Sequence, residues 1–90
     1  KSDLAESPVR ALMMVAIEAT GTDRAVGRML AMHSVRAVHS TNGRWDVIVD
    51  LATDSLTSLD DTLAKICRLD SVSSSETQLL MSTKRAKPAR

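Results

Sequence analysis

The sequence predicts an α+β fold in which four antiparallel strands form one sheet and two helices cover one of its faces. Three observations carry this prediction. Apolar runs mark four strand candidates, two segments with apolar residues at helical spacing separate them, and Asn42-Gly43 stands between the two central strand candidates. Asn-Gly in such a position is a strong hairpin signal, because a type I′ turn needs positive φ at both central residues.

The first half of the chain begins with a polar lead-in over residues 1–8 and continues with a strand over residues 9–19. Apolar residues occupy both faces of this strand, which indicates that both faces are covered. A turn over residues 20–23 supplies an N-cap, and a helix follows to about residue 32, with Val26, Met29 and Leu30 at helical spacing. A second strand is expected over residues 35–41.

The Asn42-Gly43 hairpin leads into a third strand over residues 45–52. With a two-residue loop, Ser40 opposes Trp45 and His39 opposes Asp46. The third strand then presents two sets of side chains on opposite faces, with Trp45, Val47, Val49 and Leu51 on one and Asp46, Ile48 and Asp50 on the other.

Asp54 or Ser55 is expected to cap a second helix, whose apolar stripe consists of Leu56, Leu59, Leu63 and Ile66. A polar connection over residues 71–75 leads to a last strand over residues 77–83. The resulting order is the ferredoxin-like βαββαβ pattern, with both helices on one sheet face. No segment remains to cover the other face, so we expect it to pack against a second subunit through Leu12, Met14, Ile48 and Leu80.

Composition narrows the classes of function. Ninety residues make one small domain, and 12 basic against 11 acidic residues argue against an extended nucleic-acid surface. The basic surplus gathers in a tail over residues 84–90, which is expected to be solvated, with a weak contact to DNA or a partner as the alternative.

A single cysteine, Cys67, excludes an internal disulfide and suits a reducing, cytoplasmic location. No apolar run approaches the ~20 residues of a membrane span, and no cofactor motif or metal-ligand spacing is present.

Two stretches of the sequence resemble the Lrp/AsnC transcription regulators. Gly43-Arg44-Trp45-Asp46-Val47-Ile48-Val49 looks like that family's Gly-x-aromatic-Asp strand, and Leu69-Asp70-Ser71-Val72 with Ser75-Glu76-Thr77 looks like its Leu-Pro-Gly-Val turn and Thr-x-Thr stretch. The resemblance covers residues 9–83 and corresponds to the family's effector-binding and oligomerisation domain, often called RAM. The helix-turn-helix of those regulators has no counterpart in these residues.

The resemblance implies dimers that pack sheet against sheet, assembly of dimers into rings, commonly octamers, and amino-acid effectors bound in clefts between dimers. Carried over position by position, it implies an effector site with backbone access at Gly43, an apolar wall at Trp45, an ammonium partner at Asp46 or Asp50, and further polar contacts from Arg44, Ser75 and Thr77. Asp70-Ser71 in place of Pro-Gly and Trp45 in place of the commoner Tyr depart from the family pattern.

Each residue also has a simpler interpretation. Trp45 can anchor the core, Asp46 and Asp50 can be solvated or paired sheet residues, and His39 can form a cross-strand polar pair with Asp46. Cys67 is typical of a small buried apolar residue. Three functions stay open: an effector-binding regulator domain that is not an enzyme, an assembly-only domain with a degenerate pocket, and a small ferredoxin-like dimeric enzyme.

Overall fold

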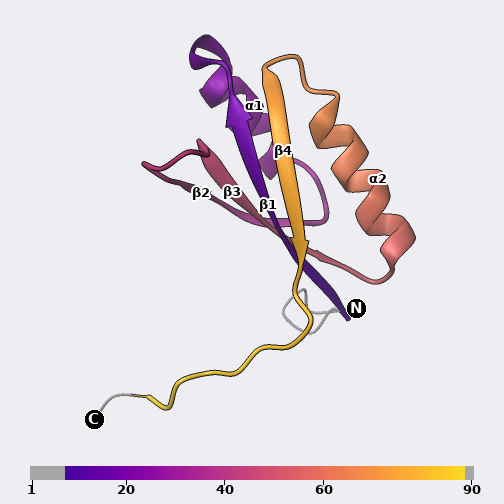
Figure 1. The fold of residues 1–90 in the computed structure, drawn as a ribbon. Coiled ribbons are helices and arrows are strands. Elements are labelled where there is room, and N and C mark those ends of the chain that lie inside the picture. The colour runs from indigo at the N-terminus through magenta and orange to yellow at the C-terminus, as the bar shows by residue number, and fades with distance from the viewer. Residues whose placement is uncertain (1–7, 89–90) are drawn as a thin grey trace.

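The computed structural model describes residues 8–88, which form a ferredoxin-like βαββαβ fold (Figure 1). The strands are β1 (Val9–Ile17), β2 (Val35–Ser40), β3 (Val47–Thr53) and β4 (Val72–Leu79). The helices are α1 (Thr22–Leu30) and α2 (Leu56–Cys67), and a 3-10 turn, η2 (Ala19–Gly21), leads into α1. The predicted fold class and order of elements are confirmed.

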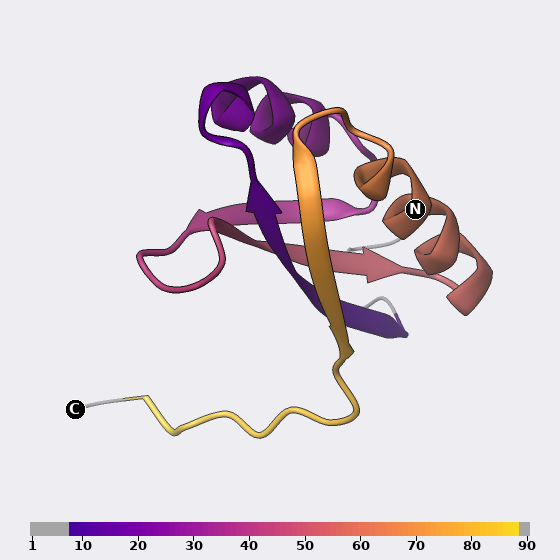
Figure 2. The ribbon, with the colours of Figure 1, turned by 45° about the horizontal axis from the view of Figure 1, so that its top comes forward.

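The four strands form one antiparallel sheet in the order β2-β3-β1-β4, so that β1 and β3 are central and β2 and β4 are edges. Both helices lie on the same side of this sheet (Figure 2). We call the other side the open face, because none of the elements within residues 8–88 covers it. It carries Leu12 and Met14 of β1 together with Ile48 and Asp50 of β3.

The core lies between the sheet and the helices. Every second residue of the central strands is buried there, namely Ala11, Met13, Val15 and Ile17 of β1 and Val47, Val49 and Leu51 of β3. The helices contribute Ala25, Met29, Leu59 and Ile66. Burying one such Val, Leu, Ile or Met side chain contributes roughly 1.5–3 kcal/mol, so this single layer dominates the stability of the fold.

Ser55 caps α2, as the sequence predicts, and its Oγ accepts a hydrogen bond from the Ser58 N–H at 3.1 Å. The predicted apolar stripe is correct from Leu59 onward, but Leu56 is 58% exposed in the first turn of the helix. Cys67 ends α2 and is exposed, so its interpretation as a buried residue is wrong. In α1, Leu30 of the predicted stripe is also exposed, because Ala25 and Met29 face the sheet instead.

The predicted two-residue hairpin is wrong. Residues 41–46 form a longer connection, closed by a 3.1 Å hydrogen bond from the Thr41 N–H to the Asp46 carbonyl, and neither Asn42 nor Gly43 has positive φ. The Asp46 N–H donates to the Val15 carbonyl of β1 at 3.0 Å. The strand β3 begins at Val47 rather than at residue 45.

The register of β2 and β3 differs from the prediction by two residues. Ser40 pairs with Val47, and His39 pairs with Ile48 rather than with Asp46. The proposed His39–Asp46 cross-strand pair therefore does not form. Because side chains alternate with a period of two, a shift of two residues leaves the predicted assignment of faces unchanged.

The last strand is also misplaced by the prediction. The strand β4 occupies residues 72–79 and includes the serine-rich segment that was expected to be a connection. An edge strand needs only backbone partners, and β1 supplies them through pairs such as Met13–Thr77 and Val15–Ser75. Leu80 lies just beyond β4, although its N–H still donates to the Arg10 carbonyl at 2.9 Å, and Met81 is 85% exposed.

Candidate functional site

The connection over residues 41–46 carries the glycine, tryptophan and aspartate that the sequence singled out. The Arg44 guanidinium lies 5.1 Å from the centre of the Trp45 ring, which is a cation–π distance. The Thr41 hydroxyl donates a hydrogen bond to the Trp45 carbonyl. Trp45 is half-buried, whereas Gly43 and Arg44 are exposed, so the loop presents an aromatic ring and a cation to its surroundings.

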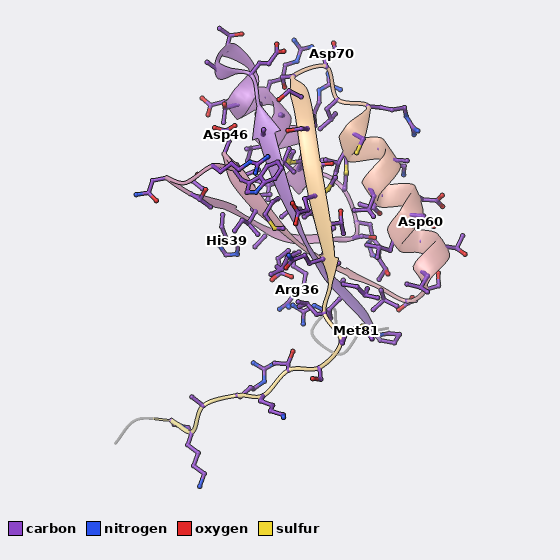
Figure 3. All side chains as sticks on the ribbon, viewed as in Figure 1. Arg36, His39, Asp46, Asp60, Asp70 and Met81 are labelled. Atoms are coloured by element: carbon purple, nitrogen blue, oxygen red, sulfur yellow. The ribbon has the colours of Figure 1, made fainter. Side chains whose placement is uncertain are left out.

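Asp46 ties this loop to the end of β1. Its carboxylate accepts a hydrogen bond from the Ile17 N–H at 2.7 Å, and Figure 3 shows Asp46 beside the end of that strand. Continuing the β1–β3 register would pair Ile17 with Trp45, but β3 has not yet begun there. The carboxylate therefore supplies the acceptor that the β3 backbone would otherwise provide, and a charged acceptor makes a stronger bond than a neutral one.

Asp50 lies on the open face rather than beside the loop. Its carboxylate oxygens lie 3.0 Å from a guanidinium nitrogen of Arg10 and 3.9 Å from one of Arg36, and all three side chains are between 20% and 31% exposed. The Arg10 Nε is buried and has no hydrogen-bond partner among the described residues. Asp50 is thus the centre of a small ionic cluster on the sheet.

Ser75 and Thr77 lie in β4 on the side of the helices, opposite the helix-facing Val15 and Met13 of β1. The Ser75 Oγ lies 3.5 Å from the Cys67 Sγ of α2. A single chain therefore does not bring the predicted effector residues together. Residues 43–46 lie at the end of β1, Asp50 lies on the open face, and the β4 pair lies on the helix side.

A pocket of about 390 Å³, which the sequence did not single out, lies between the β1–α1 connection and the α2–β4 connection. Its charged lining residues are Glu18, Arg24, Arg28, Arg68 and Asp70. The signal available in the sequence is the spacing of two arginines four residues apart, which places both on one face of α1. That Arg68 joins them depends on how α2 docks on the sheet.

The wall of this pocket is held by close backbone contacts. The Glu18 N–H donates to the Ser71 carbonyl at 2.8 Å, and the Gly21 N–H donates to the Glu18 carbonyl at 2.9 Å. A Cβ on Gly21 would lie 2.4 Å from the Ser71 Cβ, so only glycine permits this approach. The pocket wall follows Ile17, so the Asp46 carboxylate that holds Ile17 also positions this end of the pocket.

Two kinds of feature are absent from the described part of the chain. Residues 8–88 contain no group of three or more His, Cys, Asp or Glu side chains arranged to hold a metal ion. No helix within the same range is long and apolar enough to cross a membrane.

Comparison with known families identifies the family of this chain. The model of the Lrp/AsnC ligand binding domain matches residues 10–89. This chain belongs to the Lrp/AsnC ligand-binding domain family. The resemblance seen in the sequence is thereby confirmed, and the family match supports a regulatory, effector-binding domain. No curated protein matches the chain.

The solved structures that share this fold include short chains, which the match covers almost entirely, and longer chains, which it covers only in part. FFRP-DM1 is 26% identical with a TM-score of 0.77, and the match covers 81% of this chain and 99% of that one. A hypothetical protein from Pyrococcus horikoshii is 25% identical with a TM-score of 0.76, covering 83% and 92% of the two chains. Escherichia coli AsnC shares the fold with a TM-score of 0.85 at 16% identity, covering 99% of this chain but 62% of its own.

Proposed function

We propose that this Lrp/AsnC domain binds an amino-acid effector and couples that binding to its assembly into dimers and larger oligomers. The family match over residues 10–89 carries the proposal. The loop over residues 41–46 supports it, because the half-buried Trp45 and the exposed Arg44 stand at the family's motif position. In the proposal Trp45 forms an apolar wall, and Gly43 leaves the backbone open to the ligand.

The remaining predicted effector residues would complete such a site across subunits. Within one chain, Asp50 lies on the open face, whereas Ser75 and Thr77 lie on the helix side of the sheet. An effector bound between dimers would contact residues from more than one chain. Asp46 would contribute to this site by holding the loop against β1.

The open face supplies the proposed dimer contact. Leu12, Met14 and Ile48 are half-buried neighbours there, and Leu80 continues the same face beside Arg10. An apolar patch on a sheet that no element of residues 8–88 covers is typical of a surface that packs against a partner. A second copy would bring the same patch, since a two-fold interface is self-complementary.

The regulatory mechanism would be a shift in population between assemblies. An effector that binds the larger assembly more tightly than the dimer favours that assembly by its difference in affinity. An effector with equal affinity for both would change nothing. DNA binding would require a helix-turn-helix beyond the elements described, and we assign no catalytic role to the domain.

A thermal-shift screen of the chain against the twenty amino acids, with light scattering on each hit, tests the effector proposal. A ligand at about 100 times its Kd stabilises by roughly 2.7 kcal/mol. Each kcal/mol raises Tm by about 4–8 °C in a domain of this size. A selective shift of about 10 °C or more with a change in mass is expected. Uniform Tm values across all twenty would overturn the proposal.

Met14→Asp tests the dimer contact. The new carboxylate would replace an apolar side chain that the proposed interface buries, so we expect the dimer dissociation constant to rise at least about 100-fold. Leu30→Asp is the matched control, since Leu30 is 55% exposed on α1 and away from the open face. Light scattering after gel filtration reports the mass. Equal masses for both variants would contradict the proposed dimer face.

One observation favours an assembly-only domain as the second candidate. Both predicted ammonium partners are already engaged within the chain, Asp46 by the Ile17 N–H and Asp50 by Arg10. A carboxylate that fills these roles must break a hydrogen bond or ion pair before it binds a ligand. A stable oligomer whose mass and Tm no amino acid changes would support this candidate.

A further inference from the structure

The pocket between α1 and the α2–β4 connection is lined by charged residues, and none of them belongs to the loop over residues 41–46. Arg24 and Arg28 reach it from one face of α1, and Arg68 reaches it from the end of α2. Figure 3 shows Asp70, which also lines it, at the same end of the sheet as Asp46. The pocket therefore joins two segments that are distant in sequence, residues 18–28 and residues 68–71.

Within residues 8–88, the arginines of this pocket have no carboxylate in an ion pair with them. The ion pairs found among residues 8–88 involve Asp50, and none involves Arg24, Arg28 or Arg68. Glu18 and Asp70 line the same pocket and are likewise not in an ion pair within that range. Three cations and two anions that face a shared space without neutralising each other form a lining suited to a ligand of mixed charge.

We propose that this pocket is a second ligand site, separate from the loop over residues 41–46, and that it binds an acidic amino acid, aspartate or glutamate. Such a ligand carries two carboxylates and one ammonium group. Guanidinium groups bind carboxylates through paired hydrogen bonds, and Glu18 and Asp70 offer carboxylates for the ammonium group. The lining has one cation in excess, and the ligand has one anion in excess.

The size and construction of the pocket fit this class of ligand. Its volume of about 390 Å³ lies near the lower end of the range for small-molecule sites. The hydroxyls of Thr20 and Ser71 line it and can bond a second carboxylate oxygen. The Glu18–Ser71 backbone hydrogen bond and the close Gly21–Ser71 contact hold the wall before any ligand arrives. A wall fixed in advance lowers the ordering cost of binding.

Titration calorimetry of the purified chain with L-glutamate and L-aspartate tests the inference. L-glutamine and L-asparagine remove one negative charge at nearly the same shape, and glutarate removes the ammonium group. We expect binding of the acidic amino acids to exceed binding of all three comparison ligands. The affinity should also fall as salt rises, because the arginines are exposed and screened.

Arg28→Gln and Asp70→Asn are the site variants, and Arg85→Gln in the exposed C-terminal segment is the matched control. Losing one charge-assisted contact should raise the Kd for L-glutamate about 10- to 100-fold in each site variant. The control should bind as the unaltered chain does. All three positions are exposed, so the variants should fold, and circular dichroism verifies this.

The outcomes separate this inference from the proposed function. L-glutamate binding with unchanged affinity in both Arg28→Gln and Asp70→Asn would overturn the inference and leave the proposed function standing. No binding by any amino acid would overturn both. If glutarate binds as tightly as glutamate, the pocket recognises dicarboxylates in general, and the assignment to an amino acid is refuted.

Discussion

Replacing Asp46 with alanine tests whether this carboxylate holds the end of β1. In the structure it accepts the Ile17 N–H at 2.7 Å, and Ile17 is only 6% exposed, so water cannot readily replace it. A hydrogen bond to a charged group contributes about 1.5–3 kcal/mol, and loss of the acceptor leaves the N–H unpaired. We therefore expect Asp46→Ala to lower the unfolding free energy by about 2 kcal/mol.

Thermal unfolding at a fixed protein concentration measures this effect. A loss of about 2 kcal/mol corresponds to a fall in Tm of roughly 8–16 °C for a domain of this size. Asp46→Asn keeps a neutral acceptor in the same place and should lose about half as much. Asp60→Ala is the control, because Asp60 is exposed on α2 (Figure 3) and makes no hydrogen bond or ion pair within the described range. It should change stability by less than about 0.5 kcal/mol.

If Asp46→Ala and Asp60→Ala unfold at the same temperature, the carboxylate does not hold β1 and the reasoning fails. A second measurement separates support of the fold from contact with an effector. Effector affinity is compared between Asp46→Asn and the unaltered chain at a temperature where both are folded. A loss of affinity larger than the loss of stability would assign Asp46 a direct ligand contact.

Two further predictions concern the junctions between elements. Gly21→Ala should cost about 1–3 kcal/mol in chemical unfolding, because its Cβ would lie 2.4 Å from the Ser71 Cβ. Adding Ser71→Gly should restore most of the lost unfolding free energy. A double variant as unstable as Gly21→Ala alone would refute the steric clash. Ser55→Ala should cost about 1 kcal/mol, or about 4–8 °C in Tm, through loss of the α2 cap, whereas the exposed Thr57→Ala should leave Tm nearly unchanged.

The parts of the fold that the sequence predicts are those where side-chain pattern and local structure agree. Period-two burial in β1 and β3 and the Ser55 cap of α2 depend on contacts within or beside the same segment. The assignment of faces in the β2–β3 pair was correct even with the wrong register. The two-residue loop predicted at Asn42-Gly43 was wrong. The hydrogen bonds that join Asp46 to Val15 and Ile17 of β1 are long-range contacts, which no local rule contains.

The strand β4 shows a second limit. Its serines carry no strand signal, and they form a strand because the edge of β1 offers backbone partners along residues 11–17. The apolar residues Leu80 and Met81, which suggested a strand, fall where that edge ends. Propensity is a weak guide on an edge strand, since pairing and not burial decides its extent.

The sequence by itself determined the fold class, the family and the two faces of the central strands, because these follow from the spacing of apolar residues and from a local motif. Only the tertiary structure decided which charged groups meet. It places Asp50 between Arg10 and Arg36, Asp46 on Ile17, and the arginines of α1 beside Arg68. Electrostatic sites depend on distances of a few ångströms between segments far apart in the chain, and those distances are fixed by packing.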